Sequence, residues 1–142
     1  MGLTIYCKKT NRSIDMGAGG FFRLRLKVAE LLGEPWHSHY ATLRHPPLFE
    51  PARTEFFNTF DQRTKQMLQN KQVPIKVVDF CLQSDVEGCI HYGACKQIYK
   101  VVQAYDDDIA YGYAGRPDCA KFADFKAILK DCIDNKCDMV WR

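Results

Sequence analysis

Apolar residues recur along the chain in stretches that predict a strand near each end and helices between them. Residues 3–7 form a β-branched and aromatic run that ends at two lysines, which predicts a short strand. Apolar positions three to four residues apart predict a helix over about 21–32, with Gly33 as its stop. Residues 139–141 predict a closing strand, which we expect to pair with the first one.

The middle of the chain alternates between helical patterns and polar or proline-rich connections. Pro51 is placed to open a helix that runs to about residue 72, and another apolar face predicts a helix over 92–105. Residues 75–82 fit either a strand or a short helix. Asp118 is expected to cap the last helix, which directs Phe122 and Phe125 toward the core. The segments expected to be loops or turns are 10–20, 34–51 and 84–90.

These elements predict the α+β class, with several helices packed on a small sheet that pairs the N- and C-terminal strands. A chain of 142 residues with 46% hydrophobic content suits a single globular domain over 1–142 with one core. Four prolines punctuate the aromatic-rich stretch at about 34–51, which is expected to be an ordered loop or lid within that domain.

Charge, hydropathy and cysteine content exclude several function classes. The net charge of +3 is weak and the basic residues are dispersed, so duplex nucleic acid is not an expected partner. No apolar run approaches the ~18 residues of a membrane span and no signal-peptide pattern opens the chain. We therefore expect no membrane partner and a cytoplasmic location. Seven cysteines, an odd number, predict buried reduced thiols rather than a disulfide framework.

Two segments that combine glycine with arginine carry the strongest functional signal. In 15–25, three glycines precede an amphipathic helix whose first turns hold two arginines, so backbone N–H groups, the helix dipole and guanidinium groups can form an anion-binding corner. In 111–118, two tyrosines could stack on a base while an arginine binds a phosphate. The candidate ligand-binding residues are Gly19, Gly20, Arg23, Arg25, Tyr111, Tyr113, Gly115 and Arg116.

Each of these segments also has an ordinary structural interpretation. The glycines of 17–20 can serve a tight connection with surface arginines behind it, and the segment matches neither a Walker loop nor a dinucleotide fingerprint. In 111–118 the tyrosines can pack on neighbours while Arg116 pairs with the acidic run 106–108. Geometry separates the interpretations: the anion site requires the two segments to meet, within one chain or across subunits, and it fails if they lie on opposite faces.

Catalytic residues, metal ligands and cofactors are not expected. Cys81, Cys89, His91 and Cys95 offer soft ligands in a short span, and two further cysteines follow at 132 and 137, but a buried thiol on an apolar helix face is ordinary. Segment 84–90 lacks the charged oxygen ligands that a calcium loop needs at its first and twelfth positions.

Histidines raise the question of catalysis in 34–51. His37, His39 and His45 lie there, yet no nucleophile elbow accompanies them and nothing fixes a triad. A loop histidine that stacks on a neighbouring aromatic ring is the commoner outcome. The protein is therefore expected not to be an enzyme.

Several segments together carry a resemblance: 1–6, 19–25, 84–88, 106–116, 124–126 and the tryptophan at 141. Through them the chain resembles a group of small proteins encoded by phages and prophages of Gram-positive bacteria, and the resemblance covers most of its length. The group carries no activity over to this chain. The resemblance implies a phage accessory protein that acts in the cytoplasm of the bacterial host, where proteins of this kind often counter host defence.

The leading hypothesis is a non-enzymatic phage-type protein that sequesters a small anionic, nucleotide-like ligand to counter host-defence signalling. In it Arg23, Arg25 and Arg116 clamp the phosphates. An alternative is an interaction module that inhibits a host defence enzyme through exposed aromatic residues and the loop 34–51. A second alternative is a small hydrolase that acts through one of the three histidines. A homo-oligomer fits each hypothesis, because adjacent phenylalanines on a helix cannot both face the core.

Overall fold

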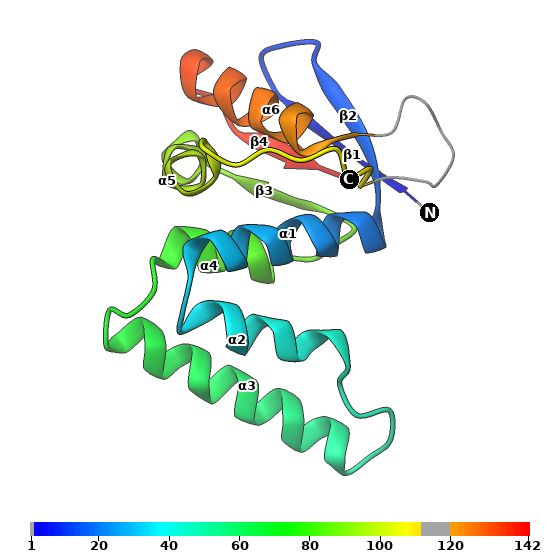
Figure 1. Ribbon diagram of the computed structural model, residues 1–142, viewed down its shortest axis with the longest axis vertical. Helices are drawn as coiled ribbons and strands as arrows, with labels where there is room; N and C mark the ends of the chain where they lie inside the picture. Colours follow the sequence, from blue (N-terminus) through cyan, green and yellow to red (C-terminus); the bar gives the residue numbers. More distant parts are fainter. Residues whose placement is uncertain (1, 112–119) are drawn as a thin grey trace.

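The computed structural model describes residues 2–111 and 120–142, and its centre is a four-stranded antiparallel sheet (Figure 1). The strand order is β2-β1-β4-β3. Strand β1 pairs with β2 on one side and with β4 on the other, while β3 pairs with β4. The first and last strands are therefore neighbours, and the predicted α+β class is confirmed. The strands are β1 (Gly2–Cys7), β2 (Ser13–Gly17), β3 (Gly88–Ile90) and β4 (Met139–Trp141).

One face of this sheet packs against the helices and contributes its side chains to the hydrophobic core. Alternate side chains of a strand point to opposite faces, and Leu3, Ile5 and Cys7 of β1 are all buried. Ile5 lies opposite Trp141 in the β1–β4 register. The Trp141 ring in turn lies 5.4 Å from the ring of Phe21. The helices that complete this core are α1 (Ala18–Leu32), α4 (Ile75–Leu82), α5 (Tyr92–Val102) and α6 (Phe122–Asn135).

A further layer of helices lies on the side of α1 that faces away from the sheet (Figure 1). It consists of α2 (Trp36–Ala41), the short 3-10 helix η1 (Thr42–Arg44) and α3 (Ala52–Gln69). The rings of Trp36 and Tyr40 in α2 stack 5.6 Å apart. The only buried residues of α3 are Phe60 and Thr64, so most of this long helix faces outward. We call the segment 34–69 the helical arm.

Several connections expected to be loops contain regular structure. Segment 10–20 includes β2, because Ile14 pairs with Ile5 and Met16 with Leu3 in register. Segment 34–51 includes α2 and η1, and segment 84–90 includes β3, which gains its partner only from β4. Residues 75–82, for which the sequence allows strand or helix, form α4.

The last helix begins later than predicted. Lys121, not Asp118, is the N-cap of α6, because the Lys121 N–H donates to the carboxylate of Asp124 at 2.8 Å. Asp124 sits in the third helical position and so satisfies a donor that the first turn of a helix leaves unpaired.

The expectation that all cysteines are reduced is wrong for one pair. Cys7 and Cys137 form a disulfide across a sequence separation of 130 residues. The β1–β4 pairing places Cys7 opposite Met139, two positions after Cys137, and so brings the two thiols together. Among the other cysteines that the structure describes, Cys81, Cys89, Cys95 and Cys132 are free, and Cys119 lies outside the described residues. In the described part of the chain, no helix has the length and apolar character that crossing a membrane requires.

Candidate functional site

The two segments that combine glycine with arginine meet where α1 begins. Gly20 packs directly against the backbone of Tyr111, and a Cβ atom at Gly20 would overlap the Tyr111 carbonyl oxygen. Arg23, one turn further along α1, donates from Nη2 to the carbonyl oxygen of Ala110 at 3.2 Å. Its guanidinium carbon also lies 5.7 Å from the centroid of the Tyr111 ring. We call this contact region the α1 seam.

Both ends of the sequence between Tyr111 and Ala120 are held at the α1 seam. The Tyr111 N–H donates to the Ala120 carbonyl oxygen at 2.9 Å. Ala110 and Lys121 form an isolated antiparallel bridge next to it. The predicted site residues Tyr113, Gly115 and Arg116 lie outside the described residues.

The N-terminus of α1 offers donors for an anion. Its N-cap is Gly17, which has no side chain to cap the helix, and its first turn contains no acidic residue. The N–H groups of residues 18–20 precede the first intrahelical donor and make no hydrogen bond with a described residue. Gly19 is exposed, and a Cβ there would meet nothing within 4 Å. None of the described residues therefore caps the positive end of the helix dipole at this point.

Tyr111 holds the seam together rather than presenting its ring to solvent. Its side chain is buried, and its hydroxyl donates to the carboxylate of Asp107 at 2.8 Å. Burial is the main cause that raises the pKa of Tyr111, and the bond to Asp107 adds to it. The Tyr105 hydroxyl donates to the same carboxylate at 2.8 Å. Three residues thus form one network that fixes the chain before the seam.

Arg25 points away from the seam into the protein. Its side chain is only 4% exposed, and Nη1 donates to the carbonyl oxygens of Phe80 at 3.3 Å and Gln83 at 2.7 Å. These carbonyls belong to the C-terminal end of α4, where a positive charge also meets the negative end of the helix dipole. The guanidinium carbon lies 4.4 Å from the centroid of the Phe21 ring. This arginine ties α1 to α4.

The spacing of the two arginines along the helix is by itself enough to separate them. Residues two positions apart on an α-helix differ by roughly 200° around the axis, so Arg23 and Arg25 cannot face one ligand together. Of the predicted residues that the structure describes, Gly20, Arg23 and Tyr111 meet at the seam, and Gly19 lies exposed beside Gly20. Arg25 does not join them.

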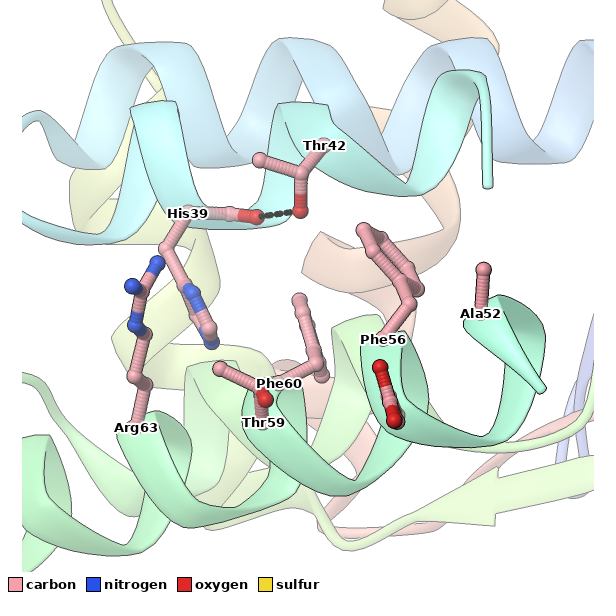
Figure 2. Close-up of a pocket in the computed structure, with 8 residues that line it drawn as sticks. His39, Thr42, Ala52, Phe56, Thr59, Phe60 and Arg63 are labelled. Atoms are coloured by element: carbon pink, nitrogen blue, oxygen red, sulfur yellow. Dashed lines mark hydrogen bonds between the residues drawn. The ribbon is translucent and has the colours of Figure 1, made fainter. Parts of the chain in front are cut away.

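A cavity of about 290 Å³ lies between α2 and the first half of α3 (Figure 2). Its walls include His39, Phe56, Phe60 and Arg63. The hydroxyl of Thr64 donates to the Phe60 carbonyl oxygen at 2.9 Å, so at the 2.8 Å contact with His39 the imidazole Nε2 is the donor. Nδ1 of His39 therefore carries the free lone pair.

The environment of His39 favours its neutral form. Burial lowers its pKa, and the nearby Arg63 guanidinium lowers it further. The imidazole stacks on Phe60 with ring centroids 4.0 Å apart. These contacts give the histidine a packing role in the helical arm. His37 lies instead beside Glu34, with Nδ1 3.6 Å from the carboxylate, and His45 is exposed at the end of η1.

The tip of the helical arm exposes large apolar side chains. Leu48 is 78% exposed and Phe49 is 80% exposed, between η1 and α3. Arg53 supports this tip, because Nη1 donates to the Pro47 carbonyl oxygen at 3.1 Å. No sequence pattern singles out these two residues within 34–51; their exposure follows from the turn that joins the two helices.

Comparisons with known proteins assign no function to this chain. They found no matching family model, no matching curated protein and no matching solved structure. The α1 seam, the cavity of the helical arm and the exposed tip are therefore judged by their own chemistry.

Proposed function

We propose that the protein is a non-enzymatic binding protein for a small phosphate-bearing ligand, held at the α1 seam. One observation carries the proposal: the two segments that combine glycine with arginine, far apart in sequence, meet through the contact of Gly20 with Tyr111. Arg23 lies exposed at the same place. The N-terminus of α1 alone would be weak support for an anion site. The exposed guanidinium of Arg23 adds a full positive charge next to the partial charge of the helix dipole.

The charges around the seam favour an anion. A guanidinium has five N–H donors, and the bond that Arg23 makes to Ala110 leaves others to face solvent. No carboxylate forms an ion pair with Arg23 among the residues that the structure describes. The nearest network acid, Asp107, already accepts from two tyrosine hydroxyls and from the Ile109 N–H. Its charge is thus partly neutralised by its own donors.

The proposal differs from the hypothesis based on the sequence in the arginines that bind the phosphate. Arg25 is occupied by the carbonyl oxygens of α4, so Arg23 takes the central role. Arg116 is assigned to the site by its sequence position alone, four residues before Ala120. The phage setting that the resemblance implies fits a part in countering host-defence signalling, and a nucleotide-like ligand fits the phosphate-binding chemistry proposed for the seam.

Calorimetric titration with a defined panel tests this proposal. The panel contains inorganic phosphate, pyrophosphate, ATP, and cyclic mono- and dinucleotides. We expect Arg23→Gln to weaken binding about 10- to 100-fold, because a charge-assisted hydrogen bond contributes roughly 1.5–3 kcal/mol. Arg44→Gln, which removes an exposed arginine of η1, is the matched control and should bind as the wild type does. Equal affinity of both variants, or no binding of any panel member by the wild type, refutes the proposal.

A second candidate function is inhibition of a host enzyme through the helical arm. The observation that favours it is the pair of exposed side chains at the tip, Leu48 and Phe49. Large apolar residues exposed side by side mark interaction sites more often than ordinary surface. Expression in a bacterial host should then recover one stoichiometric host protein with the wild type and none with the double variant Leu48→Ser, Phe49→Ser. Recovery unchanged by the double variant contradicts this candidate.

A further inference from the structure

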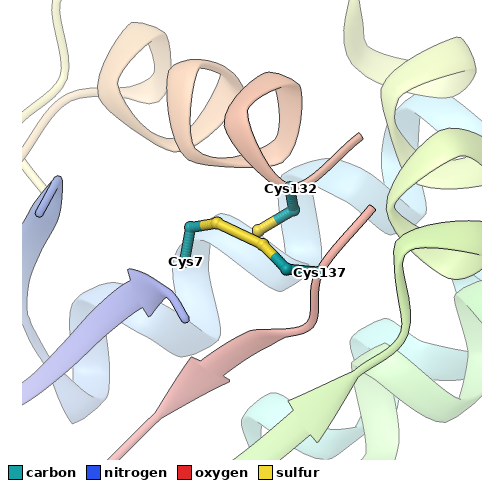
Figure 3. A group of neighbouring side chains, drawn as sticks. All are labelled: Cys7, Cys132 and Cys137. Carbon is teal, nitrogen blue, oxygen red and sulfur yellow. A yellow bond between two sulfur atoms is a disulfide. The ribbon is translucent and has the colours of Figure 1, made fainter. Parts of the chain in front are cut away.

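A cluster of buried sulfur atoms lies where β1 ends and α6 turns toward β4 (Figure 3). The Sγ atoms of Cys7, Cys132 and Cys137 all lie within 4.8 Å of one another. Cys7 and Cys132 are fully buried and Cys137 is 6% exposed. Cys7 and Cys137 form the disulfide, so Cys132 is a free thiol directly beside it. The cluster belongs neither to the α1 seam nor to the helical arm.

The backbone at the end of α6 explains how two of these cysteines meet. Lys136 adopts the left-handed conformation, with φ 50° and ψ 50°, and its N–H donates to the Ile133 carbonyl oxygen at 3.3 Å. The Cys137 N–H then donates to the Cys132 carbonyl oxygen at 3.1 Å. This pair of bonds is a Schellman motif, which packs the residue after the turn against the last helical turn. Four residues separate the two cysteines, a spacing found in zinc knuckles.

A fourth thiol, that of Cys95 on α5, lies outside the group of three sulfurs that are within 4.8 Å of one another. The thiol of Cys95 is fully buried, and the neighbouring Cys132 thiol and burial raise its pKa. The four cysteines thus come from β1, α5, α6 and the turn after α6. Lysines directly flank the cluster in sequence, at positions 8, 9 and 136, and Lys9 donates to the Asn135 carbonyl oxygen at 3.3 Å. Aspartates directly adjoin the same cysteines at positions 131 and 138, so the charge beside the cluster is mixed.

We propose that the reduced protein binds one soft, thiophilic cation such as Zn²⁺ through the three clustered cysteines Cys7, Cys132 and Cys137. Cys95 becomes the fourth donor by moving toward them from α5. Zinc–thiolate bonds of about 2.3 Å place tetrahedral ligand sulfurs roughly 3.8 Å apart, which the cluster can meet once the disulfide opens. Sulfur ligands without oxygen donors favour Zn²⁺ or Cu⁺ over Mg²⁺ or Ca²⁺. This replaces the expectation from the sequence that the cysteines hold no metal.

The disulfide and the ion exclude each other, so binding is linked to redox state. A dithiol reductant gives two electrons and two protons to the Cys7–Cys137 bond and leaves as its own disulfide. Each thiol that then becomes a ligand releases one proton to solvent. Oxidation by a small disulfide reverses both steps and expels the ion.

Native mass spectrometry with Zn²⁺ as the probe tests the proposal. Protein reduced by a dithiol and desalted without oxygen should bind one ion per chain and lose three or four protons. The oxidised protein should bind none at this cluster. Loss of fewer than three protons, or no stoichiometric ion in the reduced protein, overturns the proposal.

Two cysteine variants locate the ion. Cys132→Ser should weaken binding about 100-fold or more, because it removes the central thiol of the cluster. Cys81→Ser is the matched control, since Cys81 is a buried free thiol on α4 outside the cluster. Equal Zn²⁺ binding by Cys132→Ser and the wild type overturns the proposal. So does loss of Zn²⁺ binding in a folded Cys89→Ser variant, because Cys89 is an exposed thiol outside the cluster.

The wild type alone decides the question if Cys132→Ser does not fold. An ion that binds only the folded, reduced cluster must raise the midpoint of thermal unfolding of the reduced protein. It must leave the midpoint of the oxidised protein unchanged. A shift of equal size in both forms contradicts the cluster as the binding site.

Discussion

Gly20→Ala is the change that tests the α1 seam most directly. The added methyl group would overlap the carbonyl oxygen of Tyr111, which is backbone and cannot rotate away as a side chain does. Either the first turn of α1 or the bridge between Ala110 and Lys121 must move. Forced contacts of this kind cost about 1–3 kcal/mol. The gain in helix propensity from glycine to alanine, at most ~1 kcal/mol, offsets only part of that.

The neighbouring Gly19→Ala supplies the control within the same turn of helix. Nothing lies within 4 Å of a Cβ at Gly19, so only the propensity gain remains. We expect this variant to be unchanged or up to ~1 kcal/mol more stable than the wild type. Because the propensity gain is shared, the two single-methyl variants should differ by about 1–3 kcal/mol in free energy of unfolding, with Gly20→Ala the less stable.

Urea unfolding followed by circular dichroism measures this difference. The change should appear in the midpoint while the slope stays constant, since neither variant alters the surface exposed on unfolding. Ligand titration on the same samples connects stability with the proposed function, because a displaced seam should also weaken binding. Equal midpoints for the two alanine variants would refute the contact between Gly20 and Tyr111 and, with it, the convergence of the two segments.

Three further outcomes follow from contacts described above. Arg25→Met should lower the free energy of unfolding by about 2–4 kcal/mol in urea, because it leaves buried carbonyl oxygens of α4 unpaired; a loss below ~0.5 kcal/mol contradicts its anchoring role. The folded state lowers the pKa of His39 below its usual 6.5, so the unfolded chain binds the proton more tightly and stability should fall as the pH drops below 6.5. His39→Gln should flatten this dependence of the free energy of unfolding on pH. If the variant and the wild type have identical stability–pH profiles, His39 is not its source. Lys136→Gly should raise the free energy of unfolding by roughly 0.5–1 kcal/mol, and with it the thermal midpoint, because glycine adopts the left-handed conformation without strain. A lower midpoint than that of the wild type contradicts this prediction.

The elements predicted well are those whose signal is contained in their own sequence. The helices α1 and α5 have continuous apolar faces, α3 is opened by Pro51, and the strand pair of β1 and β4 follows from short apolar runs. Strands β2 and β3 have only five and three residues. Strand β2 pairs with the neighbouring β1, whereas β3 becomes a strand by pairing with β4, which is distant in sequence. Propensity within a short window contains no information about such a partner.

The candidate site was predictable to a similar degree. Glycine followed by arginine at 19–23 indicated a corner with donors, and the structure brings it against Tyr111. Arg25 bonds to α4 because of packing between helices, which the sequence does not reveal. The spacing of two residues between Arg23 and Arg25 on one helix does speak against both binding the same anion. The cysteine cluster joins Cys7 to Cys137 across nearly the whole chain, and only the strand pairing reveals it.

The placement of β4 between β1 and β3 has a consequence for synthesis on the ribosome. Residues 2–7 emerge early, whereas their central partner 139–141 is translated after all the helices. Until then β1 has a partner on one side only, and β3 has none, so both offer unpaired strand edges to other chains. Contacts so distant in sequence also make folding slow. The nascent protein should therefore depend on chaperones until β4 has emerged, and losing β4 should leave an aggregation-prone chain rather than a smaller folded one.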